Sequence, residues 1–251
     1  IILFAILAIV LTYSNYFRIT QEAIKATAEN YQEGFEAQLN TQIVENEAIA
    51  TDNDILNQLL KKYNDPQMDL LSDVESRTLI HDKLSQSAAS FGNRVVYSVF
   101  EMDGILVYSS DEELVGSFSH YVDDMCETLT KTQVNSTIAL NDNETGIHIL
   151  SPITIKDKYI IGVMVASIDS SYFNDFVSNS TNTYLLDNAN NCLLSTELQD
   201  SYVHQEAMNC LIQYTGDSEE LHGVISTGSI FSRELYGYSI MPEYHWIYVL
   251  K

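Results

Sequence analysis

Basic residues are scarce in this sequence. It contains 12 Lys and Arg against 35 Asp and Glu, which gives a formal net charge of −23 at pH 7. Binding to nucleic acid or to an anionic membrane surface relies on positive potential, so neither is expected as the main partner. The acidic side chains favour solubility, and their field would concentrate cations and amines near any cleft.

Cysteine is also rare. The three residues Cys126, Cys192 and Cys210 are too few for a scaffold held together by disulfides, and an odd number leaves at least one thiol unpaired. Cys192 and Cys210 could form a bridge in the second half of the chain, and three free thiols are equally compatible with the sequence. We therefore assign no redox role.

The motifs of common enzymes are missing. The sequence has no phosphate loop, no G-x-S-x-G, no H-E-x-x-H and no paired C-x-x-C. We predict that this chain is not an enzyme and carries no cofactor. His120, Asp123, Asp124 and Glu127 have the spacing of one helix face, which could hold a divalent metal. A solvent-exposed helix face in an acidic protein has the same spacing of acidic residues, so we predict no metal site.

Proline is absent from the first 63 residues, where the sequence is helical in character. The apolar run Ile1–Leu11 leads into Tyr13, Tyr16 and Phe17, and aromatic residues gather at membrane interfaces. We predict a partial transmembrane helix over residues 1–17 that is missing its first turns. A signal-peptide core is the alternative, but no small-residue cleavage site follows the run.

Residues 18–63 are predicted to form a long signalling helix. Apolar residues recur at helical spacing from Ile24 to Leu60. The spacing is close to a heptad, so the stripe could be a homodimer seam, although packing against the chain's own domain would leave the same stripe. Asp65-Pro66 ends this helix, and a further helix is predicted over residues 74–89.

Two similar hairpin patterns follow. In Phe100–Ser110 an Asp103-Gly104 turn separates two apolar runs, and glycine accepts the positive φ that such a turn needs. Leu186–Thr196 repeats the pattern 86 residues later (190 − 104 = 86), with Asn190 at the glycine position. We predict two related β-rich modules whose hairpins occupy equivalent places in two separate sheets.

The predicted fold class is α+β. It has a long N-terminal helix and two modules, each an antiparallel sheet flanked by helices. We place a membrane-distal module at residues 64–178 and a membrane-proximal module at 179–251, with a polar stretch of small residues from Asp169 near the boundary. Trp246 lies in a predicted strand and is expected in the core of the second module.

This order of parts resembles the double Cache sensor domains of bacterial membrane receptors, and the resemblance implies that the two modules are PAS-like. The resemblance covers most of the chain after Arg18 and rests on four segments in sequence order: Val99–Ser109, Tyr159–Phe176, Tyr184–Asp187 and Gly237–Leu250. It implies an extracellular domain at the cell membrane that binds a small molecule in the distal module. The signal would pass to a cytoplasmic histidine kinase, diguanylate cyclase or chemotaxis domain outside this chain. A single-anchor surface binding or adhesion protein is the alternative, and a surface enzyme is a second one.

The resemblance also implies candidate binding residues. Some members hold amino acids with an Arg-x-Trp-Tyr segment for the carboxylate and with a Tyr and two Asp for the amine. Asp142 and Asp169 fall at the two Asp positions, but Leu140 replaces the Tyr, and residues 105–158 contain neither Arg nor Trp. This argues against an α-amino acid as the ligand.

Two carboxylates beside aromatic rings such as Tyr108 and Tyr121 would instead suit a cationic amine. We therefore predict that Tyr108, Tyr121, Asp142 and Asp169 bind an amine or an amino-acid-like compound. The plainer interpretation is that Asp142 is a turn residue and Asp169 a helix cap.

Overall fold

The computed structural model describes the chain in segments. These are residues 2–119, 122, 129, 136–140, 146–156, 159–169, 171–173, 183–189, 192–195, 201–214, 221–229 and 233–251. Two compact units are present: unit 1 comprises residues 1–37 and 173–251, and unit 2 comprises residues 38–172. The sequence-based boundaries at 64, 178 and 179 remain predictions.

Helix α1 (Ile2–Ala50) contributes residues to both units, and its first residues are apolar and exposed. By length and composition α1 could cross a membrane. The helix expected over residues 18–63 lies in two pieces, because α1 ends at Ala50 and α2 (Asn53–Asn64) starts anew. The Asp52 carboxylate caps α2 by accepting the backbone N–H groups of Asp54 and Ile55 at 2.8 and 3.4 Å.

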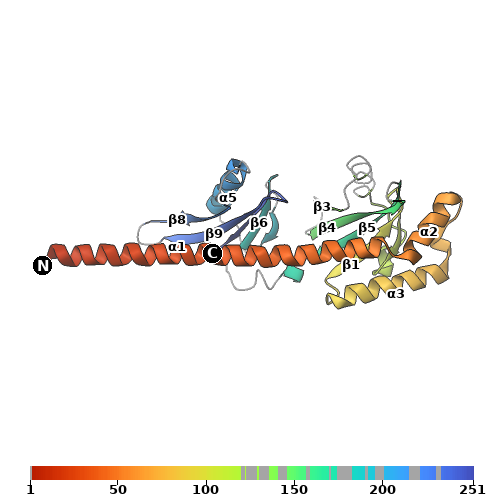
Figure 1. The fold of residues 1–251 in the computed structure, drawn as a ribbon, viewed down its shortest axis with the longest axis horizontal. Helices are drawn as coiled ribbons and strands as arrows, with labels where there is room; N and C mark the ends of the chain where they lie inside the picture. The colour runs from red at the N-terminus through yellow and green to blue at the C-terminus, as the bar shows by residue number, and fades with distance from the viewer. Residues whose placement is uncertain are drawn as a thin grey trace. The chain divides into compact units, whose positions relative to one another are not determined.

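Unit 2 contains a five-stranded antiparallel sheet in the order β2-β1-β5-β4-β3. Its strands are β1 (Val95–Phe100), β2 (Leu106–Ser109), β3 (Thr137–Leu140), β4 (Gly146–Ile155) and β5 (Tyr159–Asp169). Helix α3 (Val74–Ser90) packs on β1 and β2, and the short 3₁₀ turns η1 (Leu70–Ser72) and η2 (Glu112–Leu114) flank these elements. Figure 1 shows α2 and α3 beside this sheet.

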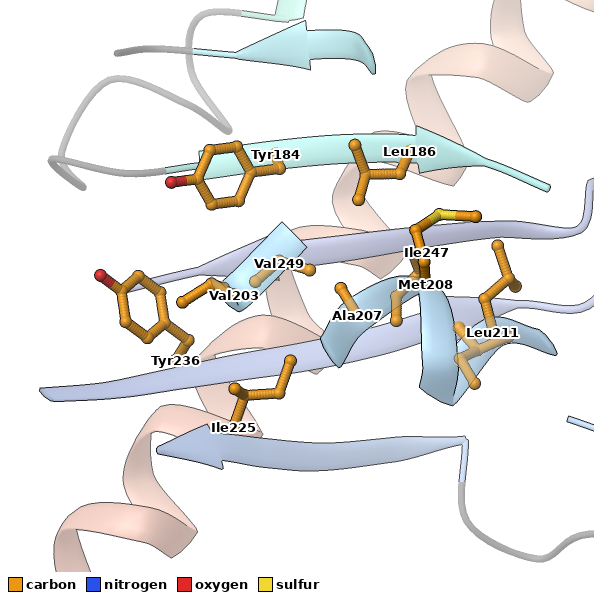
Figure 2. Packing of buried hydrophobic residues seen from close by; sticks show 11 residues of the cluster. Tyr184, Leu186, Val203, Ala207, Met208, Leu211, Ile225, Tyr236, Ile247 and Val249 are labelled. Atoms are coloured by element: carbon orange, nitrogen blue, oxygen red, sulfur yellow. The ribbon is translucent and has the colours of Figure 1, made fainter. Parts of the chain in front are cut away.

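Unit 1 contains a second five-stranded antiparallel sheet, in the order β7-β6-β10-β9-β8. Its strands are β6 (Thr183–Asp187), β7 (Cys192–Ser195), β8 (His222–Thr227), β9 (Glu234–Met241) and β10 (Trp246–Leu250). Helix α5 (Ser201–Gln213) covers one face of the sheet, and Figure 2 shows its Val203, Ala207 and Leu211 packed over the strands. On the other face α1 approaches so closely that a Cβ on Gly237 would overlap the Ile24 carbonyl oxygen.

The two sheets have the same strand order, which confirms the predicted duplication of the hairpin. The β1–β2 ladder shifts register between Val99 and Phe100, and the β6–β7 ladder shifts between Leu185 and Leu186. The offset between these bulges is again 86 residues (185 − 99 = 86). A bulge is a conserved feature of strand geometry, so its repetition at the same offset supports two copies of one module. The α+β class with a long N-terminal helix is likewise confirmed.

Candidate functional site

The sheet of unit 2 turns one face toward the C-terminal part of α1. Two buried amides of α1 bind this face. Gln42 accepts the Tyr97 hydroxyl through Oε1 at 2.8 Å and donates through Nε2 to the Tyr172 hydroxyl at 2.9 Å. The Asn46 amide nitrogen donates to three acceptors on β4 and β5, among them the Ser151 hydroxyl at 2.8 Å. These hydrogen bonds hold the helix on this face of the sheet, although the Asn46 Oδ1 atom is buried without a hydrogen-bond partner. The opposite face is therefore the candidate site.

The opposite face carries an apolar cluster. Its buried members come from β1, β2, β4 and β5 and from two positions before β3. They are Phe100, Leu106, Val122, Leu129, Leu150, Val163 and Val165. The strand register confirms that they share a side, because Val163 is paired with Phe100 and Val165 with Leu150. Small-molecule sites are predominantly apolar with a few placed polar groups, and this face has that composition.

Two polar pairs lie on the same face. The Ser98 and Ser109 hydroxyls are 3.1 Å apart and both are buried. His148 Nδ1 lies 2.9 Å from the Ser167 hydroxyl, and the His148 side chain is buried. Hydroxyl and imidazole groups can both donate and accept, so these pairs offer directional contacts to a ligand. These four residues were not among the predicted site residues, although a His and three Ser inside apolar strands are a signal that the sequence contains.

The structure places Asp169 at the end of β5, where it is exposed. Its carboxylate accepts the Ser171 N–H at 2.8 Å. Hydrogen bonds from the Ser171 side chain and backbone, with a smaller contribution from the positive charge of Arg94, lower the pKa of Asp169 despite some desolvation. The carboxylate therefore caps the turn at residues 171–173, as the plainer interpretation expected, and it stays charged near neutral pH.

Tyr108 does not lie with the apolar cluster. It is paired with Val99, which is paired in turn with Met164 on the side of the sheet that faces α1. The bulge separates Leu106 from Tyr108, so the two residues face opposite sides although they are two positions apart. Burial raises the pKa of Tyr108, and the negative charges of Asp73 and Glu101 raise it further. Asp169 and Tyr108 are thus not brought together.

Tyr121 and Asp142 lie outside the described residues, and so do His120, Asp123, Asp124, Glu127 and Cys126. Within the described segments, no group of three or more His, Cys, Asp or Glu could hold a metal ion. Cys192 and Cys210 both pack against the core cluster of unit 1, and Cys210 is a free thiol. Burial raises the pKa of the Cys210 thiol, which disfavours a reactive thiolate there.

Two hollows in unit 2 lie away from the candidate face. The first, of about 420 Å³, is lined by α2 and α3, and the second, of about 320 Å³, lies where α1, α2 and α3 meet. Lys83 forms ion pairs with Asp52 (2.9 Å) and with Asp54. Asp54 lines the first hollow, and Asp52 and Lys83 line the second. Burial alone would raise the pKa of Asp52, but the hydrogen bonds from Lys83 and two backbone amides lower it. Both hollows are lined by residues of the packed helices, and none of the predicted site residues is among them.

The structure of this chain is similar to solved structures of sensor domains. No protein-family model matches the sequence, and no curated protein is significantly similar to it. Solved structures do match over nearly the whole chain. They include the sensor domain of the histidine kinase DctB of V. cholerae (TM-score 0.60, 14% identity, 94% of this chain and 98% of that one). The extracellular domain of the putative histidine kinase vpHK1S-Z8 also matches (TM-score 0.64, 11% identity, 94% and 93%).

The sensory domain of the Campylobacter jejuni chemoreceptor Tlp3 (CcmL) is a third similar structure (TM-score 0.60, 16% identity, 96% of both chains). It has also been crystallised with isoleucine and with L-valine bound. These are double Cache domains, so the fold expected from the sequence resemblance is confirmed. The matched domains are named as sensor, sensory or ligand-binding domains.

Proposed function

We propose that this chain is the extracytoplasmic sensing domain of a bacterial transmembrane receptor. The observation that carries the proposal is the double Cache fold over nearly the full chain, shared with sensor domains of histidine kinases and a chemoreceptor. The exposed apolar start of α1 would anchor it in the cell membrane, with the domain outside the cell. A homodimer through the long helix would have to use the exposed side of α1, because Phe35 and Leu39 of its heptad-like stripe are buried within the chain.

The ligand is proposed to bind unit 2 on the apolar face that carries the Ser98–Ser109 and His148–Ser167 pairs. Asp169 lies at the edge of that face, since it follows Val163, Val165 and Ser167 at alternate positions of β5. With Asp142 and Tyr121 it would bind a cationic amine or an amino-acid-like compound. Tyr108 is omitted from this site because it lies on the opposite side of the sheet from the apolar cluster.

A ligand screen on the full chain in detergent micelles tests this proposal. Amines, amino acids and carboxylates are added in turn, and the unfolding temperature is measured, because a ligand that binds the folded state raises it by mass action. Any hit is repeated with Asp169→Asn and Asp142→Asn. Loss of a charge-assisted hydrogen bond should weaken binding by about 10- to 150-fold.

Asp82→Asn is the matched control, since Asp82 is an exposed carboxylate on α3 away from the face. It should leave affinity unchanged. Hits confined to carboxylates, or an amine that binds both Asp variants as tightly as the wild type, would remove the counter-charge role. A hydrophobic span after Lys251 in the gene would distinguish a receptor from a single-anchor surface protein.

A further inference from the structure

The basic residues of unit 1 gather toward one end of the unit. Of the 12 Lys and Arg residues in the chain, those in unit 1 are Arg18, Lys25, Arg233 and Lys251. The first two lie on α1 soon after its apolar start, and the other two lie next to strands β9 and β10. The contacts of Arg233 and Lys251 place the cations of the sheet at this same end.

Arg233 lies against α1 immediately before β9. Its guanidinium carbon is 4.7 Å from the centroid of the Phe17 ring, which is a cation–π contact. Phe17 in turn stacks on Tyr13, one turn earlier in the helix, with 6.4 Å between the ring centroids. Further along β9, Gly237 packs closely against the Ile24 carbonyl group. Strand and helix therefore run side by side from this end of the unit, and Arg233 lies level with Phe17.

The level of Phe17 corresponds to the headgroup layer of a bilayer. The large apolar side chains of α1 between Leu3 and Leu11 are exposed, as expected of a segment in hydrocarbon. An α-helix rises about 1.5 Å per residue, so Phe17 lies about 9 Å beyond Leu11. The headgroup layer is about 5–8 Å thick on each side of the core, and aromatic residues gather there. The long side chain of Arg233 can reach lipid phosphates from this position.

The positive charge of Arg233 is available to an external anion. Arg18 forms an ion pair with Glu22 (3.9 Å) on the helix itself. Lys251 forms an ion pair with Glu234 (2.7 Å), the residue that follows Arg233. Arg233 is exposed and forms no ion pair within the segments that the structure describes. Carboxylates thus balance two of the cations and leave the guanidinium of Arg233 free to bind phosphate, which it can do bidentately.

The net charge of −23 on the whole chain does not oppose this contact. Charges in water are screened over about 8 Å at physiological ionic strength, so a headgroup responds to the nearest side chains. On α1 the unpaired acidic side chains start at Glu29, about 18 Å beyond Phe17. The local field beside Phe17 is therefore set by Arg233 and the two ion pairs.

We propose that this end of unit 1 is a lipid-binding surface, on which Arg233 contacts phospholipid headgroups beside Phe17. The inference rests on the proposed function, because that function places the start of α1 in the membrane. Anionic lipid would hold the start of β9 at the bilayer surface. Lipid composition thereby becomes an input to unit 1, separate from the proposed ligand site in unit 2.

The test places a fluorescent reporter at each end of the sheet in the full chain. The chain is reconstituted into nanodiscs of phosphatidylcholine with or without phosphatidylglycerol, and Trp246→Phe removes the sole native tryptophan. Thr227→Trp puts a reporter at the Arg233 end, because Thr227 is paired with Glu234. Glu243→Trp is the matched reporter, at an exposed position beyond the other end of β9. A lipid with a nitroxide on its headgroup should quench the reporter at 227 and leave the one at 243 bright.

The charge dependence identifies the group that binds. Quenching at 227 should increase with phosphatidylglycerol and decrease with added salt. Arg233→Gln should weaken the contact equilibrium by about 5-fold, the effect of one basic residue at an anionic surface, and Arg233→Lys should retain it. Lys61→Gln is the control variant, because it removes one positive charge from an exposed position of unit 2. It should leave quenching at 227 unchanged.

Flotation of the chain with phospholipid vesicles separates this inference from the proposed function. A chain that does not float lacks the membrane anchor, and both proposals fall. A chain that floats but shows no quenching at 227, or the same quenching in Arg233→Gln, overturns the lipid contact alone. If Arg233→Gln does not fold, the Arg233→Lys chain decides, since quenching that ignores both phosphatidylglycerol and salt would also overturn it.

Discussion

Asn46 offers the sharpest test of how α1 is held on the sheet of unit 2. The residue is fully buried, and its amide nitrogen donates to Ile149 O (3.1 Å), Ser151 Oγ (2.8 Å) and Met164 O (3.2 Å). Truncation to alanine removes these hydrogen bonds and leaves the two carbonyl oxygens with one partner fewer. A net hydrogen bond contributes about 1 kcal/mol, and a stranded buried polar group costs about 1–3 kcal/mol. Truncation also removes Asn46 Oδ1, a buried oxygen without a hydrogen-bond partner, which offsets part of this loss. We therefore expect Asn46→Ala to lower the free energy of unfolding by about 1–3 kcal/mol.

Urea unfolding followed by far-UV circular dichroism measures this loss, and Trp246 fluorescence reports on unit 1 in the same samples. Asn30→Ala is the matched control, because Asn30 is the same residue type on an exposed position of the same helix. Its effect should stay within about 0.5 kcal/mol. Equal effects of Asn46→Ala and Asn30→Ala would refute the assignment of Asn46 as an anchor.

Asn46→Asp sharpens the test through its pH dependence. An ionised carboxylate would face two carbonyl oxygens without a proton to donate, so this variant should be less stable at pH 7 than Asn46→Ala. Protonation restores one donor, so the folded state would bind the proton more tightly than the unfolded state. Stability of this variant should therefore rise as pH falls from 7 to 4. If the loss of stability in Asn46→Asp does not change with pH, the introduced carboxylate is solvated rather than buried against the carbonyl oxygens.

Three further outcomes are expected. Trp246→Ala should destabilise unit 1 by about 3–5 kcal/mol in a denaturant titration, since the ring is 5% exposed; a loss below about 1 kcal/mol would contradict this. Gly237→Ala should lower the unfolding temperature, because the added methyl group would overlap the Ile24 carbonyl, and a neutral result would show that α1 can move away. Lys83→Met should reduce stability near pH 7 but less below about pH 4, because the lowered pKa of Asp52 contributes stability only while that carboxylate is ionised. A constant difference between Lys83→Met and wild type from pH 7 to pH 3 would count against the ion pair.

Local patterns were enough to predict the elements and their repetition. The Asp103-Gly104 turn and its counterpart near Asn190 predicted the hairpins, and the structure confirms β1–β2 and β6–β7 at equivalent places in two sheets. Turn residues and strand alternation depend on a few neighbouring positions. They therefore predict a hairpin without any knowledge of tertiary contacts. The helical stripe of α1 was predicted for the same reason, and Phe35 and Leu39 from that stripe are buried.

Contacts between distant residues decided the rest. Tyr108 was predicted to share a site with Asp169, but the bulge in the β1–β2 ladder places it on the side of the sheet opposite the apolar cluster, and a bulge depends on the partner strand. The apolar spacing of α1 gave no indication that Gln32 and Asn46 are buried, because each finds its partners more than 100 positions away in the chain. A buried amide is stable only when such partners are present. The sequence by itself therefore determined the helices, the hairpins and the duplicated module, whereas only the tertiary structure decided which polar side chains tie α1 to the sheets.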